Sequence, residues 1–181
     1  MNRFIIIKRV VRRPFFYGLW IDGCEGDDPV RFTPKDGDPL FDMIKPVVQG
    51  LGMALVELSA SRHRGSVQVR AVIYKAGTIG VDDCSQVHRA VLPRLELAFP
   101  GQELSVEVSS PGIDRLIKDG AELVHYIGRG VKCYRRDISD WSAGILTAAD
   151  ETHLMLHGKE GMIELIYEDI AKAKLDYSQE V

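Results

Sequence analysis

The hydrophobic pattern of the chain changes once, at Ser109-Ser110-Pro111-Gly112, and this change divides the patterned part of the sequence into two modules. Before this corner, apolar residues recur at helical spacing in some segments and at alternating spacing in others. After it, short alternating runs follow one another. Such a change predicts two different layers rather than one continuous sheet. The 181 residues are enough for two small domains.

The first module covers residues 38–117 and predicts the order helix, strand, strand, helix, strand. The first helix is expected to begin after Asp38, whose carboxylate can cap it, and to end near Gly50. The second helix is expected to begin at Asp82 or Asp83, where acids favour the positive end of the helix dipole. Two helices on one face of a three-stranded sheet form a small α+β layer.

Alternating apolar residues define the three expected strands of this module. They lie near residues 53–60, 66–75 and 104–108. In the first strand, Val56, Leu58 and Ala60 are expected on one face, because neighbouring side chains of a strand point to opposite faces. The other face of the sheet is polar, and we expect it to be solvated or to contact a partner.

The second module covers residues 118–181 and predicts a small β-barrel. A short helix is expected at residues 121–126, and five short β-like runs follow it. They lie near 129–136, 142–149, 152–157, 161–166 and 171–177. Short strands separated by turn residues are typical of small barrels. The predicted fold class is therefore α+β with two domains, an N-terminal α-β-β-α-β layer followed by a small C-terminal barrel.

Residues 1–37 precede both modules and predict a flexible N-terminal extension. The apolar run Phe4–Ile7 is shorter than the stretch of about 7–15 residues that a secretory signal needs. The three cysteines, Cys24, Cys84 and Cys133, are too scattered for a disulfide framework. A cytoplasmic location is therefore expected.

The sequence contains no pattern typical of a catalytic, cofactor or metal site. It has no Walker loop, no G-x-G-x-x-G, no G-x-S-x-G and no H-E-x-x-H. His153 and His157 lie four residues apart without a further ligand near them in sequence, whereas zinc requires three or four ligands. We therefore expect a non-enzymatic protein with no cofactor, no metal and no small-molecule substrate.

The corner is the most informative segment. Pro111-Gly112 predicts a type II turn, in which glycine supplies the positive φ. Around it stand two hydroxyls and an acid–base pair: Ser109, Ser110, Asp114 and Arg115. One interpretation is an ordered corner held by local hydrogen bonds. The other is a rigid contact loop, in which Arg115 binds a phosphate or a carboxylate.

Four stretches of the chain together resemble the ribosome maturation factor RimP family. They are residues 51–56, 81–89, 104–115 and 166–175, in the order and spacing of that family. The serine–serine–proline–glycine corner is the most specific of these features. The resemblance implies an α+β N-terminal domain and a C-terminal Sm/SH3-like barrel. It also implies a factor required for maturation of the 30S ribosomal subunit, which binds the immature pre-30S particle and ribosomal protein uS12 near 16S rRNA.

The resemblance and the charges suggest which residues contact these partners. Candidates for RNA or ribosome contacts are Arg62, Arg64, Arg70, Lys75, Arg89, Ser109, Ser110, Asp114 and Arg115. Candidates for partner contacts in the barrel are Arg129, Lys132, Arg135 and Arg136. Residues 118–181 carry 8 basic and 12 acidic residues, which favours a basic protein such as uS12 over naked RNA.

A general RNA-binding module that is not dedicated to the ribosome is the alternative. The first module would then act like a KH domain, which clamps a nucleic-acid backbone with a G-x-x-G loop. Gly77-Thr78-Ile79-Gly80 has this spacing but contains no basic residue. The barrel also has Thr152-His153 where Sm-type RNA binders usually carry a Met-Asn pair, so base-specific uridine binding is not expected of it.

Overall fold

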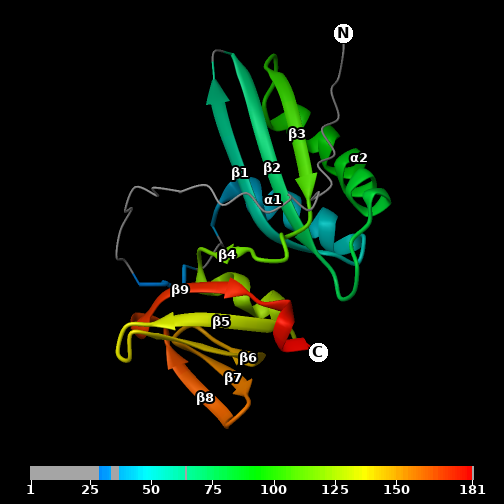
Figure 1. Ribbon diagram of the computed structural model, residues 1–181. Helices are drawn as coiled ribbons and strands as arrows, with labels where there is room; N and C mark the ends of the chain where they lie inside the picture. Colours follow the sequence, from blue (N-terminus) through cyan, green and yellow to red (C-terminus); the bar gives the residue numbers. More distant parts are fainter. Residues whose placement is uncertain (1–28, 34–36, 64, 181) are drawn as a thin grey trace, which may run out of the picture. The chain divides into compact units, whose positions relative to one another are not determined.

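The computed structural model describes residues 29–33, 37–63 and 65–180. They form two compact units (Figure 1). The first unit contains residues 37–111, and the second contains residues 29–33 and 112–180. The sequence prediction placed this border after residue 117, but residues 116–117 pair with a strand of the second unit and therefore belong to it. Within the described ranges, no helix has the length and apolar character needed to span a membrane.

The first unit has the predicted order of helices and strands. Its elements are α1 (Pro39–Gly50), β1 (Ala54–His63), β2 (Ser66–Tyr74), α2 (Val81–Ala98) and β3 (Glu103–Ser109). The sheet order is β1-β2-β3, with β1 antiparallel and β3 parallel to β2. A parallel pair needs a crossover connection, and α2 supplies it.

Two carboxylates position the helices of this unit, as the sequence predicts. Asp38 caps α1 by accepting hydrogen bonds from the backbone N–H groups of Leu40 and Phe41, at 2.9 and 3.4 Å. Asp83 lies in the first turn of α2 and accepts the N–H of Gly80 at 2.8 Å. Both ends therefore have a partner for backbone donors that the helix itself leaves unpaired.

The core of the first unit lies between the helices and one face of the sheet. Phe41, Ile44 and Val48 of α1 and Val87 of α2 pack there against the sheet. The expected alternation of β1 is wrong at one position, because a bulge shifts the register between Leu55 and Glu57. Leu55 therefore joins the cluster under the helices, where Leu58 packs against it as predicted, and Val56 at the bulge is also buried, at 1% exposure.

The second unit is built around one six-stranded sheet. Its strands are β4 (Leu116–Ile117), β5 (Gly130–Arg135), β6 (Asp140–Ala149), β7 (His153–Gly158), β8 (Gly161–Ile166) and β9 (Ile170–Leu175). The predicted helix is the 3-10 helix η1 (Gly120–Tyr126), and two shorter ones are η2 (Tyr167–Asp169) and η3 (Tyr177–Glu180). All neighbouring strands pair antiparallel.

The strand order of this sheet is β4-β9-β5-β6-β7-β8. Its inner face buries Val131, Leu146, Leu156 and Ile170, all of them 0% exposed. The helices and the two sheets of the chain establish the α+β class. In the six-stranded sheet, β4 and β8 are the two edges, so closure into an Sm/SH3-like barrel stays a prediction.

Residues 29–33 form an extended segment that is part of the second unit. The N–H of Val30 donates to the carbonyl of Ile170 at 2.9 Å, and the carbonyl of Arg31 accepts the N–H of Gly120 at 2.8 Å. The Val30 side chain is 7% exposed. Residues 1–28, which make up most of the predicted extension, lie outside the described residues.

Candidate functional site

The basic candidates of the first unit lie on two opposite faces of its sheet. Arg62 pairs in register with Val67, whose side chain lies in the core, so Arg62 is on the helix-covered face. Its guanidinium lies 5.5 Å from the centre of the Phe99 ring. Arg70 is on the other face and forms an ion pair with Glu107 at 3.4 Å. One flat partner surface therefore cannot contact both arginines.

Of two further predicted contact residues, Lys75 and Arg89, only Lys75 forms an ion pair with a described acid. Lys75 forms an ion pair with Asp83 at 2.8 Å, and the hydrogen bond from Lys75, followed by that from Gly80, lowers the pKa of Asp83. Arg89 is exposed on α2, and its Nε donates to the carbonyl of Ser85 at 3.3 Å. Arg89 forms no ion pair with any residue in the described part of the chain. Arg64 lies outside that part.

One cation of the first unit was missed at the sequence level. Arg94 is exposed near the C-terminal end of α2, beyond Pro93. Proline inside a helix removes one backbone hydrogen bond and often ends or kinks the helix. The helix continues to Ala98, however, and carries Arg94 on its surface.

The corner does not contain the predicted type II turn. Gly112 is not among the glycines with a positive φ, so that part of the prediction is wrong. The hydrogen-bonded turn lies two positions later, where the N–H of Arg115 donates to the carbonyl of Gly112 at 3.2 Å. Its two central residues are Ile113 and Asp114, which need no glycine. Ser109 ends β3, and Ser110 follows it half-buried.

Arg115 points into the second unit rather than into solvent. Its Nε and Nη2 donate to Oε2 of Glu122, at 2.9 and 2.8 Å. The side chains of Arg115 and Glu122 are 12% and 2% exposed. This geometry favours the interpretation of an ordered corner, and a contact of Arg115 with RNA stays a prediction.

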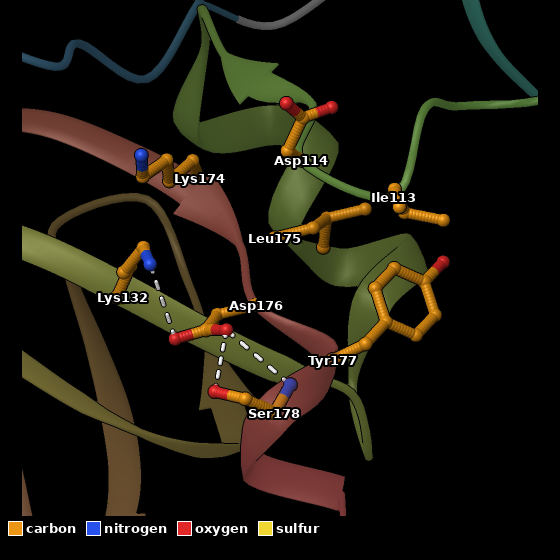
Figure 2. Close-up of a pocket in the computed structure, with 8 residues that line it drawn as sticks. All are labelled: Ile113, Asp114, Lys132, Lys174, Leu175, Asp176, Tyr177 and Ser178. Carbon is orange, nitrogen blue, oxygen red and sulfur yellow. Dashed lines mark hydrogen bonds and ion pairs between the residues drawn. The ribbon is translucent and has the colours of Figure 1, made fainter. Parts of the chain in front are cut away.

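Three of the four predicted barrel contacts are cations bound to acids of the same unit. Arg129 pairs with Glu180 at 2.8 Å and lies 4.4 Å from the centre of the Tyr177 ring. Lys132 forms an ion pair with Asp176 at 3.4 Å, and Figure 2 shows their side chains facing each other. Arg135 forms an ion pair with Asp137. The fourth, Arg136, is half-buried, and its backbone N–H donates to the Asp169 carbonyl at 2.8 Å.

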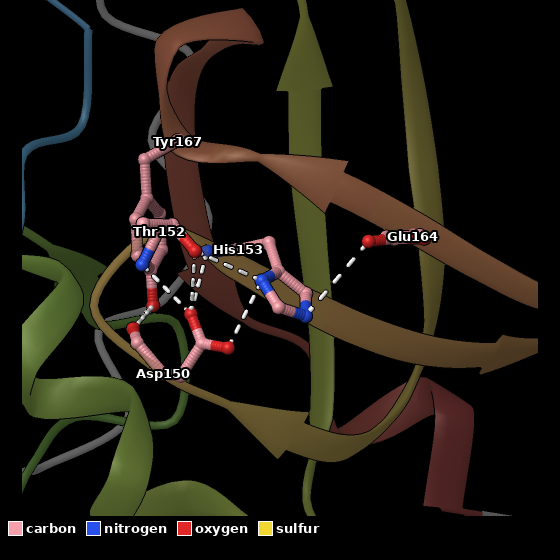
Figure 3. A network of polar contacts seen from close by, with 5 residues as sticks. All are labelled: Asp150, Thr152, His153, Glu164 and Tyr167. Atoms are coloured by element: carbon pink, nitrogen blue, oxygen red, sulfur yellow. Dashed lines mark hydrogen bonds and ion pairs between the residues drawn. The ribbon is translucent and has the colours of Figure 1, made fainter.

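The turn between β6 and β7 is closed by its own side chains (Figure 3). The carboxylate of Asp150 accepts the N–H groups of Thr152 and His153 at 2.7 and 2.9 Å. These two hydrogen bonds lower its pKa. The hydroxyl of Tyr167 donates to the Asp150 carbonyl at 2.8 Å. The polar groups of Asp150, Thr152 and His153 bind one another in this turn, at the position where Sm-type RNA binders usually carry a Met-Asn pair.

Comparison with known proteins gives the family of the chain. Residues 43–114 match the family model described as the RimP N-terminal domain. The Ribosome maturation factor RimP of Borrelia hermsii (strain HS1 / DAH) is 30% identical over 140 residues, which are 77% of this chain and 96% of that protein. The chain belongs to the RimP family. The RimP proteins of Borrelia recurrentis (strain A1) and Borrelia turicatae (strain 91E135) are 28% and 29% identical, over 78% and 77% of this chain and 96% of each relative.

The described cations of the two units differ in whether an acid of the same chain forms an ion pair with them. In the first unit, the exposed arginines Arg62, Arg89 and Arg94 form no ion pair with a described residue, whereas Arg70 and Lys75 do. In the second unit, sequence reasoning missed Trp141, Lys172 and Lys174, which the strand register brings close together. A run of alternating lysines, Lys172 and Lys174, was the signal for them in the sequence.

Proposed function

We propose that the protein is a non-enzymatic assembly factor required for maturation of the 30S ribosomal subunit, and that it acts by binding the pre-30S particle and ribosomal protein uS12 near 16S rRNA. The observation that carries this proposal is the family match, which covers 96% of a relative named Ribosome maturation factor RimP. Binding without bond chemistry is enough for such a role, because a factor that prefers one arrangement of RNA and protein shifts the population toward it. The expected place of action is the cytoplasm.

The charge distribution of the second unit supports a basic protein partner for part of its surface. Exposed acids lie at both ends of the β7–β8 hairpin, and β8 forms one edge of the sheet. They are Glu151 before β7, Glu160 in the β7–β8 turn and Glu168 in η2. A surface of this sign attracts a basic ribosomal protein and repels RNA phosphates. We therefore assign the uS12 contact to this edge rather than to the four cations that the sequence suggested.

The helix-covered side of the first unit is the better candidate for rRNA. Arg62 and Arg89 are exposed there and form no ion pair with any described residue. A phosphate that binds them does not have to displace a protein carboxylate. Arg70, on the opposite face, would have to give up Glu107. Of the cations that the sequence suggested in the first unit, we therefore keep those on the helix-covered side as rRNA contacts.

Two variants of equal charge change test this assignment. Arg62→Glu and Arg70→Glu each reverse one exposed cation of the same sheet, on opposite faces. We expect Arg62→Glu, alone or with Arg89→Glu, to weaken co-sedimentation with purified pre-30S particles at least fivefold, and Arg70→Glu to leave it within twofold. Equal losses for both variants would contradict the choice of face. Normal 30S levels in cells depleted of the protein would contradict the assembly role itself.

The uS12 contact has a separate test. Glu160→Lys and Glu168→Lys should reduce capture of purified uS12, whereas Glu96→Lys on the first unit should not. Each variant changes the net charge equally, so a loss confined to the second unit identifies the surface. Capture that is unchanged by both second-unit variants would move the uS12 contact elsewhere.

A general RNA-binding module remains the second candidate, and salt dependence distinguishes the two. A protein that holds free RNA through many phosphates loses affinity steeply as salt rises. A factor that recognises the precursor particle through shape and protein contacts should lose less. Filter binding to free 16S rRNA and to the precursor at two salt concentrations separates these outcomes.

A further inference from the structure

The outer face of the second unit's sheet carries a group of lysines and aromatic rings that no function above uses. We call it the lysine–tryptophan face. It consists of Lys132, Tyr134, Trp141, Lys172 and Lys174. All five alternate along β5, β6 and β9 with buried residues such as Cys133 and Ala173. They therefore point to the side of the sheet opposite the core.

The strand register brings these residues into two neighbouring rows. In one row Lys132 of β5 pairs with Lys174 of β9. In the next row Tyr134 pairs with Lys172 on one side and with Trp141 on the other. Neighbouring strands are about 4.8 Å apart, so the members of each row are in contact distance of one another.

The rings and the ammonium groups contact each other directly. The ammonium groups of Lys132 and Lys174 lie 6.0 and 5.2 Å from the centre of the Trp141 ring. Tyr134 packs edge-on against the same ring, with centres 5.4 Å apart. Trp141 nevertheless remains 42% exposed, which is unusual for so large an apolar side chain. An exposed indole between cations has the features of a stacking surface for a base whose phosphate is held beside it.

The charge of this face is positive although the unit as a whole is acidic. Lys172 and Lys174 form no ion pair with a residue that the structure describes. Lys132 forms an ion pair with Asp176 at 3.4 Å. None of the five residues of the face is acidic, and the exposed acids Asp137, Asp140 and Asp169 lie at the ends of β5, β6 and β9. Lys132 and Lys174 also line a pocket with the carboxylates of Asp114 and Asp176 and with the apolar side chains of Ile113, Leu175 and Tyr177 (Figure 2).

We propose that the lysine–tryptophan face binds a short segment of single-stranded RNA. A base stacks on the exposed part of the Trp141 ring, and the three lysines hold the neighbouring phosphates. An RNA duplex does not fit this mode, because its bases are already stacked on each other and hidden from a flat protein surface. Sequence preference is expected to be weak, since every base has a stacking face. This inference goes beyond the assembly role, and it does not depend on uS12 or on a precursor particle.

The intrinsic fluorescence of the full-length protein gives a direct readout. The chain has two tryptophans, and Trp20→Phe leaves Trp141 as the single indole. We expect a twelve-nucleotide oligouridine to quench this fluorescence saturably at low salt. Trp141→Leu, measured with a labelled oligonucleotide, should weaken binding about tenfold, which matches the loss of one stacked base. An exposed position tolerates leucine, and a thermal melt confirms that the variant is folded.

Matched charge reversals test the role of the lysines. Lys172→Glu should weaken RNA binding at least fivefold and reduce the slope of log affinity against log salt by about 0.7, the value for one phosphate on a single strand. Lys159→Glu makes the same charge change at an exposed position in the β7–β8 turn and should have an effect below twofold. If both variants weaken binding equally, the proposal is wrong, because the attraction is then unspecific.

Three further outcomes would overturn the proposal. One is the absence of quenching while the oligonucleotide binds. Another is equal affinity for a duplex of the same length. The third is equal quenching by polyglutamate, which would identify an acidic peptide as the ligand. Because free RNA is the probe, a negative result leaves the proposed role in 30S assembly standing, and a failure of that role leaves this result unaffected.

Discussion

Arg115 and Glu122 form an ion pair that is almost completely removed from solvent, with both guanidinium donors at 2.9 and 2.8 Å from one carboxylate oxygen. The pair joins the segment after the corner to η1. A charge that is buried in this way is costly without its partner. Each of the two residues therefore offsets the cost of burying the charge of the other.

We expect Arg115→Ala to lower the free energy of unfolding by about 3–5 kcal/mol, because it removes the guanidinium that pairs with the buried Glu122 carboxylate. Chemical denaturation measures this loss. Asp114→Ala is the control, since the neighbouring carboxylate is exposed and its removal should change stability by about 0.5 kcal/mol or less. An equal effect of both variants would show that the ion pair contributes little.

The double variant Arg115→Met, Glu122→Leu separates stability from RNA contact. Replacing a buried ion pair by apolar side chains of similar size is often neutral for stability. We therefore expect this variant to fold and to bind the precursor particle like the unchanged protein. A folded double variant that no longer binds would restore Arg115 as a direct contact, as the sequence suggested.

Gly112 and Gly144 should lose different amounts of stability on the same substitution. Gly112 has no positive φ, and an added Cβ would meet only the Asp114 carboxylate at 3.6 Å. At Gly144 the Cβ would lie 2.6 Å from the backbone oxygen of His157, so β6 and β7 would have to separate. We expect Gly144→Ala to cost about 1–3 kcal/mol of unfolding free energy and Gly112→Ala less than about 0.5 kcal/mol.

Thermal and chemical denaturation of the two alanine variants provide the comparison. Gly112 belongs to the most family-specific segment of the chain, so a large loss of precursor binding without a loss of stability in Gly112→Ala would indicate a contact role for the corner. A loss of stability at Gly112 as large as that at Gly144 would contradict the turn geometry described above.

Much of the first unit could be predicted from its sequence because its signals are local. The Asp38 cap, the alternation of β2 and the apolar stripe of α2 each depend on residues near one another in the chain. The bulge at Val56 could not be predicted, since it depends on how β1 pairs with β2. Pro46 and Pro93 lie inside α1 and α2, and both helices continue past them although each proline removes one backbone donor.

The candidate site was harder to predict, because a cation's availability depends on partners far away in the chain. Arg70 and Glu107 are 37 residues apart, and Arg129 and Glu180 are 51 apart. Nothing near Arg70 or Arg129 in the sequence indicates these pairs. The lysine–tryptophan face was missed for the same reason, since it appears only when β9, β5 and β6 are placed in register.

Val30 should be required for the stability of the second unit, although it lies in the predicted N-terminal extension. Its side chain is 7% exposed, and its N–H donates to the carbonyl of Ile170. We expect Val30→Asp to cost about 3 kcal/mol, from lost burial and from the charge introduced into an apolar site. Faster hydrogen exchange at the Gly120 amide, which donates to Arg31, is the local readout.

The matched control is Val81→Asp, which introduces the same charge at an exposed valine in the first turn of α2. An acid at this end of a helix is favourable, so stability should be unchanged or slightly higher. If Val30→Asp has as small an effect as Val81→Asp, residues 29–33 do not contribute to the second unit.

Asp150 should make the stability of the second unit depend on pH. Hydrogen bonds from the N–H groups of Thr152 and His153 lower the pKa of this carboxyl below its ordinary value of 3.8. A carboxyl whose pKa is lower in the folded state stabilises the fold above its unfolded pKa, and this stabilisation is lost as pH falls through the folded pKa. Asp150→Ala should therefore lower the melting temperature at pH 7, and the difference from the unchanged protein should shrink as the pH falls below about 4.

Glu151→Ala is the control, because it removes the exposed neighbouring carboxylate and should have little effect at either pH. A pH-independent loss in Asp150→Ala, or an equal loss in Glu151→Ala, would contradict the role of the network in Figure 3.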